Sequence, residues 1–151
     1  MDKGQPSSSR TMVERFLETT ISERPGDLAD FFAPTVVMEM PFAAGLYPPR
    51  IDTTREQLRA RFAAGASVRR YTGLDNVLIH QTTDPGTIIV EYELRGEMVA
   101  TGEPFQLRYA MFMTIRDGLI THTRDYADPI TGARILGRLP ELLTALAGTD
   151  H

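Results

Sequence analysis

Two long stretches in the second half of the chain alternate between apolar and polar side chains. From Thr87 to Arg95 every second position is apolar: Ile88, Val90, Tyr92 and Leu94. Because successive side chains of a strand point to opposite faces, this spacing predicts a strand with one buried face. Residues 105–115 alternate in the same way, and Arg116-Asp117-Gly118 predicts a tight hairpin to a strand over 119–126. With a strand over 68–80, the sequence predicts a meander of four long strands.

The first half of the chain favours helices. Thr11 and Glu14 have the spacing of a capping box, so a first helix is expected over residues 11–21. Its apolar face comprises Val13, Phe16, Leu17 and Ile21. A second, short helix is expected from a cap at Asp27 to Pro34, and a third is expected after the capping signal at 53–56.

A short strand over 35–40 and a tail helix over 136–146 complete the expected elements. Helices segregated on one side of an antiparallel sheet define the α+β class. The expected fold is a curved antiparallel sheet wrapped around about three N-terminal helices, with a cleft at its open end. Residues 1–10 are polar and are expected to form a disordered lead, and residues 11–147 are expected to form one domain.

The loop over 41–50 is rich in Pro and Gly but also carries Phe42, Leu46 and Tyr47. Large apolar side chains in a loop either cover a pocket as a lid or pack into the core. The sequence leaves both alternatives open.

Charge and composition exclude several functions. Sixteen basic and 20 acidic residues give a net charge of −4, which disfavours nucleic acid and anionic membranes as partners. With no cysteine, thiolate catalysis and thiolate metal sites are excluded, and a cytoplasmic location is expected. The three histidines, His80, His122 and His151, share no ligand spacing, so no metal site is expected.

Several short segments together resemble a known family. They are Met38-Glu39-Met40-Pro41-Phe42, Pro48-Pro49-Arg50, Arg55-Glu56-Gln57-Leu58, Arg116-Asp117-Gly118-Leu119-Ile120 and Arg124-Asp125-Tyr126-Ala127-Asp128-Pro129. Over about residues 11–139 the chain resembles the SnoaL-like branch of the nuclear transport factor 2-like superfamily, and within it the phenazine-biosynthesis A/B proteins. The resemblance implies a homodimer of cone-shaped subunits, each with a deep apolar pocket for a small apolar or aromatic molecule and no cofactor.

The resemblance also implies a catalytic acid. In the SnoaL-like cyclases an acidic residue on the last strand points into the pocket, and that position is Asp125 here. A carboxyl facing an apolar cavity loses hydration, which raises its pKa toward neutrality and suits it to acid–base catalysis. The alternative is an Asp125 that pairs with Arg124 or caps the following turn at the strand end. Glu91 and Glu93 match the region that carries polar partners in limonene-type epoxide hydrolases, and the alternative for them is a solvent-facing polar stripe.

Other positions depart from the relatives. The base of the steroid isomerases falls at Met40, with Glu39 facing the opposite side, and their helical tyrosine falls at Phe16. The histidine of the phenazine proteins falls at Arg61. Seven side chains are expected to line the pocket: Phe16, Met40, Phe42, Phe62, Tyr109, Met111 and Thr123.

Two functions follow as hypotheses. The first is a cofactor-independent enzyme of secondary metabolism that isomerises, cyclises or dehydrates its substrate through the Asp125 carboxyl. The second is a non-catalytic protein that uses the same pocket to bind a ligand. An epoxide hydrolase is a further alternative.

Overall fold

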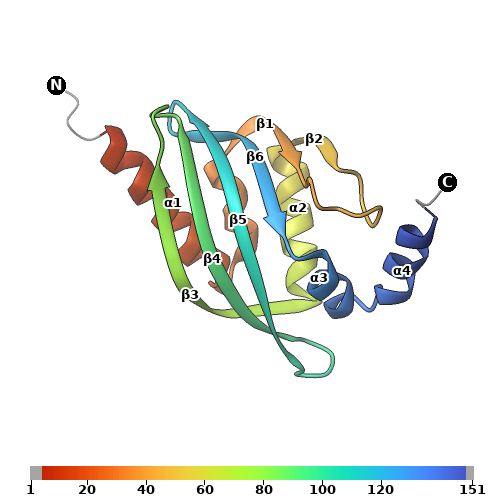
Figure 1. The fold of residues 1–151 in the computed structure, drawn as a ribbon. Helices are drawn as coiled ribbons and strands as arrows, with labels where there is room; N and C mark the ends of the chain where they lie inside the picture. The colour runs from red at the N-terminus through yellow and green to blue at the C-terminus, as the bar shows by residue number, and fades with distance from the viewer. Residues whose placement is uncertain (1–4, 149–151) are drawn as a thin grey trace.

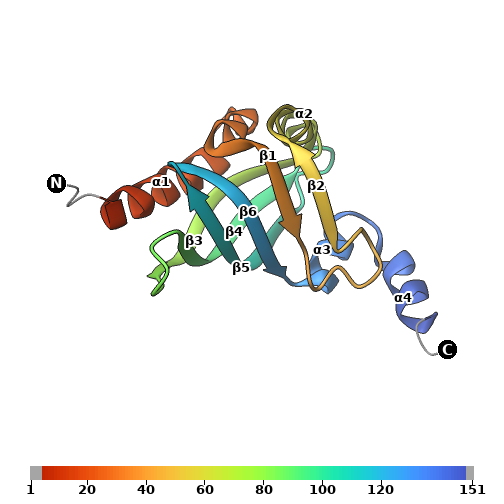
Figure 2. The ribbon, with the colours of Figure 1, turned by 90° about the horizontal axis from the view of Figure 1, so that it is seen from above.

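The computed structural model describes residues 5–148 and shows an α+β fold around one curved sheet (Figure 1). The six strands lie in the order β2-β1-β6-β5-β4-β3. Their bounds are Phe32–Glu39 (β1), Arg50–Thr54 (β2), Arg69–Gln81 (β3), Thr87–Met98 (β4), Pro104–Arg116 (β5) and Leu119–Ala127 (β6). Strands β3 to β6 form the predicted antiparallel meander. In Figure 2 the strands arc beneath the N-terminal helices, so those helices cover one face of the sheet.

One strand pair departs from the expected antiparallel sheet. Strand β1 runs parallel to β6, and β2 then pairs antiparallel with β1 at the edge. Alternation predicts which residues of a strand are buried but not which strand it pairs with, so the sequence did not indicate this pair. The parallel pair places Met38 opposite Thr123 and Glu39 opposite Arg124.

The helices are α1 (Gln5–Thr20), the 3-10 helix η1 (Pro25–Phe31), α2 (Arg55–Ala66), α3 (Pro129–Ile135) and α4 (Leu139–Ala147). The predicted start of the first helix at Thr11 is wrong, because α1 already includes residues 5–10 of the expected disordered lead. Residues 1–4 lie outside the described part. Pro34 does not end the second helix, since β1 begins at Phe32 and includes this proline.

The third helix begins one residue later than its predicted signal. Thr54, not Thr53, is its N-cap: the Thr54 hydroxyl accepts a hydrogen bond from the Gln57 amide at 3.2 Å. The Thr54 amide donates to Gln57 Oε1 at 3.0 Å, which completes a capping box. The expected tail helix over 136–146 corresponds to α4, which begins at Leu139, and α3 was not predicted. Gly137, with a φ of 67°, lies between the two helices.

The main core lies between α1, η1, α2 and the covered face of the sheet. Phe16 of α1 packs edge-to-face on Phe31 and Phe32, with ring centroids 5.7 and 6.0 Å apart. The apolar side chains of β4 predicted from alternation, Ile88, Val90, Tyr92 and Leu94, are all buried in this core. The polar side chains of β4 therefore point to the opposite, outer face.

The loop over 41–49 packs onto the C-terminal helices. Leu46 is buried with Ala133 of α3 and Leu142 of α4, and Tyr47 packs against the same group. Gly45 has a φ of 81°, and a Cβ there would lie 3.1 Å from Ala145 Cβ of α4. Phe42 remains 58% exposed. The sequence leaves open whether these side chains form a lid or pack inside the protein, and Leu46 and Tyr47 are packed.

Candidate functional site

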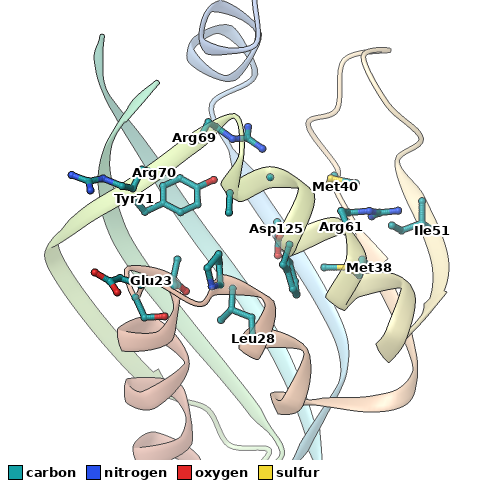
Figure 3. A pocket seen from close by; sticks show the side chains of 16 residues that line it. Glu23, Leu28, Met38, Met40, Ile51, Arg61, Arg69, Arg70, Tyr71 and Asp125 are labelled. Atoms are coloured by element: carbon teal, nitrogen blue, oxygen red, sulfur yellow. The ribbon is translucent and has the colours of Figure 1, made fainter. Parts of the chain in front are cut away.

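A cavity of about 580 Å³ opens beside α2 (Figure 3). Its lining combines apolar and ionisable side chains. The apolar set is Leu28, Met38, Met40, Ile51, Phe62 and Ala66. The ionisable set is Glu23, Arg61, Arg69, Arg70, Tyr71 and Asp125. An apolar concave site with a few converging polar groups is the usual form of a small-molecule pocket.

Asp125 reaches the cavity because of the register of β6. It lies opposite Met111 of β5, on the covered face of the sheet. A register irregularity between the pairs Thr114–His122 and Ile115–Ile120 lets Ile120 face the core as well. His122 faces outward, with its Nε2 3.3 Å from Glu39 Oε2. The parallel β1 follows the same pattern, so Met38 and Met40 line the cavity while Glu39 does not.

One oxygen of the Asp125 carboxyl is shielded from solvent. Its Oδ1 atom is inaccessible to solvent and has no hydrogen-bond partner among the described residues. Arg124 does not neutralise it, because the Arg124 guanidinium lies over the Phe112 ring, 4.7 Å from the centroid. Burial therefore raises the pKa of Asp125 to about 7. A carboxyl with this pKa exists in both protonation states near neutral pH, as an acid–base catalyst requires.

Tyrosine side chains surround the carboxyl. Tyr92 and Tyr109 are stacked, with ring centroids 5.2 Å apart. Burial raises the pKa of Tyr109, with further contributions from Tyr71 and Asp125, so its phenol stays protonated. Tyr109 also lines a second cavity of about 170 Å³ together with Phe42 and Tyr47. Asp125 and Met40 line both cavities, so the carboxyl lies where the two spaces approach each other.

Glu91 and Glu93 do not join Asp125. Glu91 Oε2 lies 2.7 Å from His80 Nε2, and Glu93 accepts hydrogen bonds from Gln106 Nε2 at 2.6 Å. Glu93 also forms an ion pair with Arg108 at 3.3 Å. All of these groups lie on the outer face of the sheet, since odd-numbered positions of β4 point away from the core. Grouping the two glutamates with Asp125 is therefore wrong, and the polar-stripe interpretation describes them.

The seven expected lining residues divide into two groups. Met40, Phe42, Phe62 and Tyr109 line one or both cavities. Phe16, Met111 and Thr123 do not line either cavity and are buried in the core instead. Phe16 is covered by Phe31 and Phe32, and Met111 and Thr123 lie deeper in the sheet, facing the packed helices.

Sequence reasoning missed most of the polar lining. The sequence indicates Arg61 only as the position of a replaced histidine, and it gives no pocket role to Arg69 or Arg70. Tyr71, two residues into β3, was not singled out. Arg61 and Phe62 are consecutive residues of α2, but no sequence pattern indicates which helix face borders a cavity. Predicting these lining residues from the sequence would require knowing that α2 faces Asp125.

Over residues 5–148 no group of three or more His, Asp or Glu side chains is arranged to hold a metal ion. His151, the third histidine, lies outside the described residues. None of the described helices is both long and apolar enough to span a membrane.

The sequence matches a known protein family. Residues 13–123 match the SnoaL-like domain. The chain belongs to the SnoaL-like family. A related sequence is the Bacillus subtilis (strain 168) protein YesE, which is 30% identical over 59 residues. This match spans 39% of the present chain and 40% of YesE.

Solved structures of similar shape support the same assignment. A candidate isomerase from Bacillus subtilis superposes with a TM-score of 0.79 at 19% identity, over 89% of this chain and 96% of the other. A candidate polyketide cyclase from Pseudomonas putida gives 0.70 at 13% identity, over 83% and 96%. A Catenulispora acidiphila protein with a ketosteroid isomerase-like fold gives 0.65 at 18% identity, over 83% and 92%. The SnoaL-like chain thus has the cone-shaped nuclear transport factor 2-like fold that its sequence predicts.

Proposed function

We propose that this SnoaL-like protein is a cofactor-independent enzyme of secondary metabolism that moves a proton on a small organic substrate. The observation that carries the proposal is the Asp125 carboxyl in the 580 Å³ cavity, with a pKa of about 7 and an Oδ1 atom that has no partner. The fold neighbours named as a candidate isomerase and a candidate polyketide cyclase support this class of chemistry.

The proposed reaction begins at a C–H bond next to a carbonyl group. The Asp125 carboxylate takes the proton, and the C–H electron pair moves into the carbonyl to give an enolate. Tyr109 is a protonated phenol in the wall of the smaller cavity, which Asp125 also lines, so it offers a hydrogen-bond donor to an enolate oxygen on that side of Asp125. Protonated Asp125 then returns the proton to a different carbon, which isomerises the substrate. If the enolate carbon attacks a second carbonyl, the proton goes to the new alkoxide and a ring closes.

The test does not require the natural substrate. 2-Tetralone is small enough for the cavity and has acidic C–H bonds beside its carbonyl. We expect the wild-type protein to accelerate exchange of these protons in D₂O, measured by ¹H NMR, and Asp125→Asn to lower the protein-dependent rate by at least about a hundredfold. The rate should rise as pH increases through about 7, because the carboxylate is the base.

The control is Asp75→Asn, which also removes a carboxylate. Asp75 pairs with Arg95, away from the cavity, so exchange should be unchanged. Equal exchange rates for wild-type protein and Asp125→Asn would overturn the catalytic role of Asp125.

A non-catalytic binding protein is the second candidate, and one observation favours it. Among the described residues, no second acid or base is hydrogen-bonded to Asp125. Under this alternative, ligands bind in the cavity but 2-tetralone exchange stays at the buffer rate. The epoxide hydrolase alternative loses its support, because Glu91 and Glu93 lie on the outer face. The homodimer implied by the resemblance stays a prediction.

A further inference from the structure

Two cations that line the large cavity lack partners. Arg61 of α2, which is exposed, and Arg69 at the start of β3, which is half-buried, both line the space, and within the described chain neither side chain makes a hydrogen bond or an ion pair. The Arg69 Nε atom is also inaccessible to solvent. A buried N–H group without a partner costs free energy, which an anionic ligand group can recover.

The other charged side chains at the cavity leave the part lined by Arg61 and Arg69 positive. Arg70 is neutralised by Glu97, 3.1 Å away. In Figure 3 Glu23 lies at the end of α1, while Arg61 extends toward the side of Met40 and Ile51. Arg69 also extends toward that side in this view. Asp125 carries at most a partial charge near neutral pH.

The surfaces beyond these arginines are apolar. Met38, Met40 and Phe62 line the wall that continues toward Asp125. A ligand that satisfies both regions has an apolar ring body and one anionic group. Arginine binds carboxylates through two parallel N–H···O hydrogen bonds, which favours a carboxylate as that group.

We infer that the substrate of this cavity is an aromatic or alicyclic carboxylic acid, whose carboxylate pairs with Arg61 and Arg69 while its ring system lies along the apolar wall toward Asp125. The inference rests on the proposed function, because only an enzyme has a substrate. It narrows the expected substrate class from apolar molecules in general to organic acids. It assigns Arg61 and Arg69 to substrate binding, a role that the sequence did not indicate for either residue.

Two probes of nearly equal size and shape test the inference. 2-Naphthoate carries the carboxylate, and 2-naphthamide replaces it with a neutral amide. Isothermal titration calorimetry at pH 6 keeps Asp125 mostly protonated, so it adds little repulsion. We expect wild-type protein to bind 2-naphthoate about tenfold more tightly than 2-naphthamide or better, as one charge-assisted contact provides.

Variants locate the source of the preference. Arg61→Gln and Arg69→Gln should each weaken 2-naphthoate binding about tenfold and leave 2-naphthamide binding within about twofold, which also shows that the cavity is intact. The matched control is Arg108→Gln, which removes a cation on the outer face of the sheet and should change neither affinity. Equal affinities of the wild-type protein for both probes, a loss in Arg108→Gln as large as in the other variants, or no measurable binding would overturn the inference.

The Asp125→Asn variant separates this inference from the proposed catalysis. It should keep the preference for 2-naphthoate even though 2-tetralone exchange is lost. If exchange proves independent of Asp125 while the preference still depends on Arg61 and Arg69, only the catalytic proposal fails. If the preference is absent while exchange depends on Asp125, only the organic-acid inference fails.

Discussion

At the scale of single residues, the proposed function depends on one carboxyl, that of Asp125, whose charged form is destabilised by burial in the cavity. Asp125 is surrounded by apolar side chains and neutral phenols, and Arg124, next to it in sequence, faces the other side of the sheet. A buried group whose charge has no counterion reduces stability, so such a group is retained where function needs it.

The cost of this carboxyl can be measured. The pKa is about 7 in the folded protein and 3.8 in the reference state, so the folded protein retains a proton that the unfolded chain releases between these values. The contribution of Asp125 to the free energy of unfolding is therefore fully present below about pH 4 and is lost as pH rises to about 7. Above pH 7 we expect Asp125→Asn to be more stable than wild type by up to about 4 kcal/mol in urea unfolding.

The same comparison at pH 4 should show a much smaller difference, because the Asp125 carboxyl is then protonated in the folded protein and close to its pKa of 3.8 in the unfolded chain. A difference between the two proteins that does not change from pH 4 to pH 8 would mean that Asp125 is hydrated in the folded state.

The position of Asp125 could be predicted from sequence, and the positions of its neighbours could not. The resemblance located the acid on the last strand. For Glu91 and Glu93 alternation indicates a shared face, but only the register with Gln106 and Arg108 shows that it is the outer one. Arg61 and Arg69 come from two different elements, and their approach to one cavity is a tertiary property.

At the scale of elements, α2 matters most because it carries Arg61 and Phe62 above the sheet. Its start is fixed by the Thr54–Gln57 capping box. We expect Thr54→Ala to lower the free energy of unfolding by about 1 kcal/mol, because the Gln57 amide loses its acceptor. Urea unfolding measures the loss.

Thr54→Ser is the matched control, since it keeps the hydroxyl that accepts the hydrogen bond. It should lie much closer to wild type than Thr54→Ala does. Equal losses in the two variants would show that the hydroxyl does not cap α2.

The elements themselves were predicted where the sequence has a regular period. The four-strand meander follows from alternation and from the turn at Asp117 and Gly118, whose φ angles of 51° and 76° suit a hairpin. The capping pair at Thr11 and Glu14 misled because the same spacing occurs inside a helix. Pro34 misled because proline fits the beginning of a strand as well as the end of a helix.

At the scale of the whole molecule, the curved sheet and the covering helices leave a cavity of about 580 Å³ with Asp125 in its wall. The smaller cavity beyond Met40 adjoins the loop over 41–49, which α3 and α4 hold in place. The C-terminal helices therefore support the far side of the site. Since one scaffold of this kind hosts many reactions, the chemistry depends on the few polar groups that reach the cavity.

The protonation state of Asp125 in the intact protein is the most direct test of this account. Carboxyl ¹³C shifts of aspartate-labelled protein can be followed from pH 3 to pH 9, with Asp125→Asn identifying the signal that disappears. We expect that signal to titrate with a midpoint near pH 7, as burial in the cavity requires. A midpoint near pH 4 would show a hydrated carboxylate and would contradict the central claim.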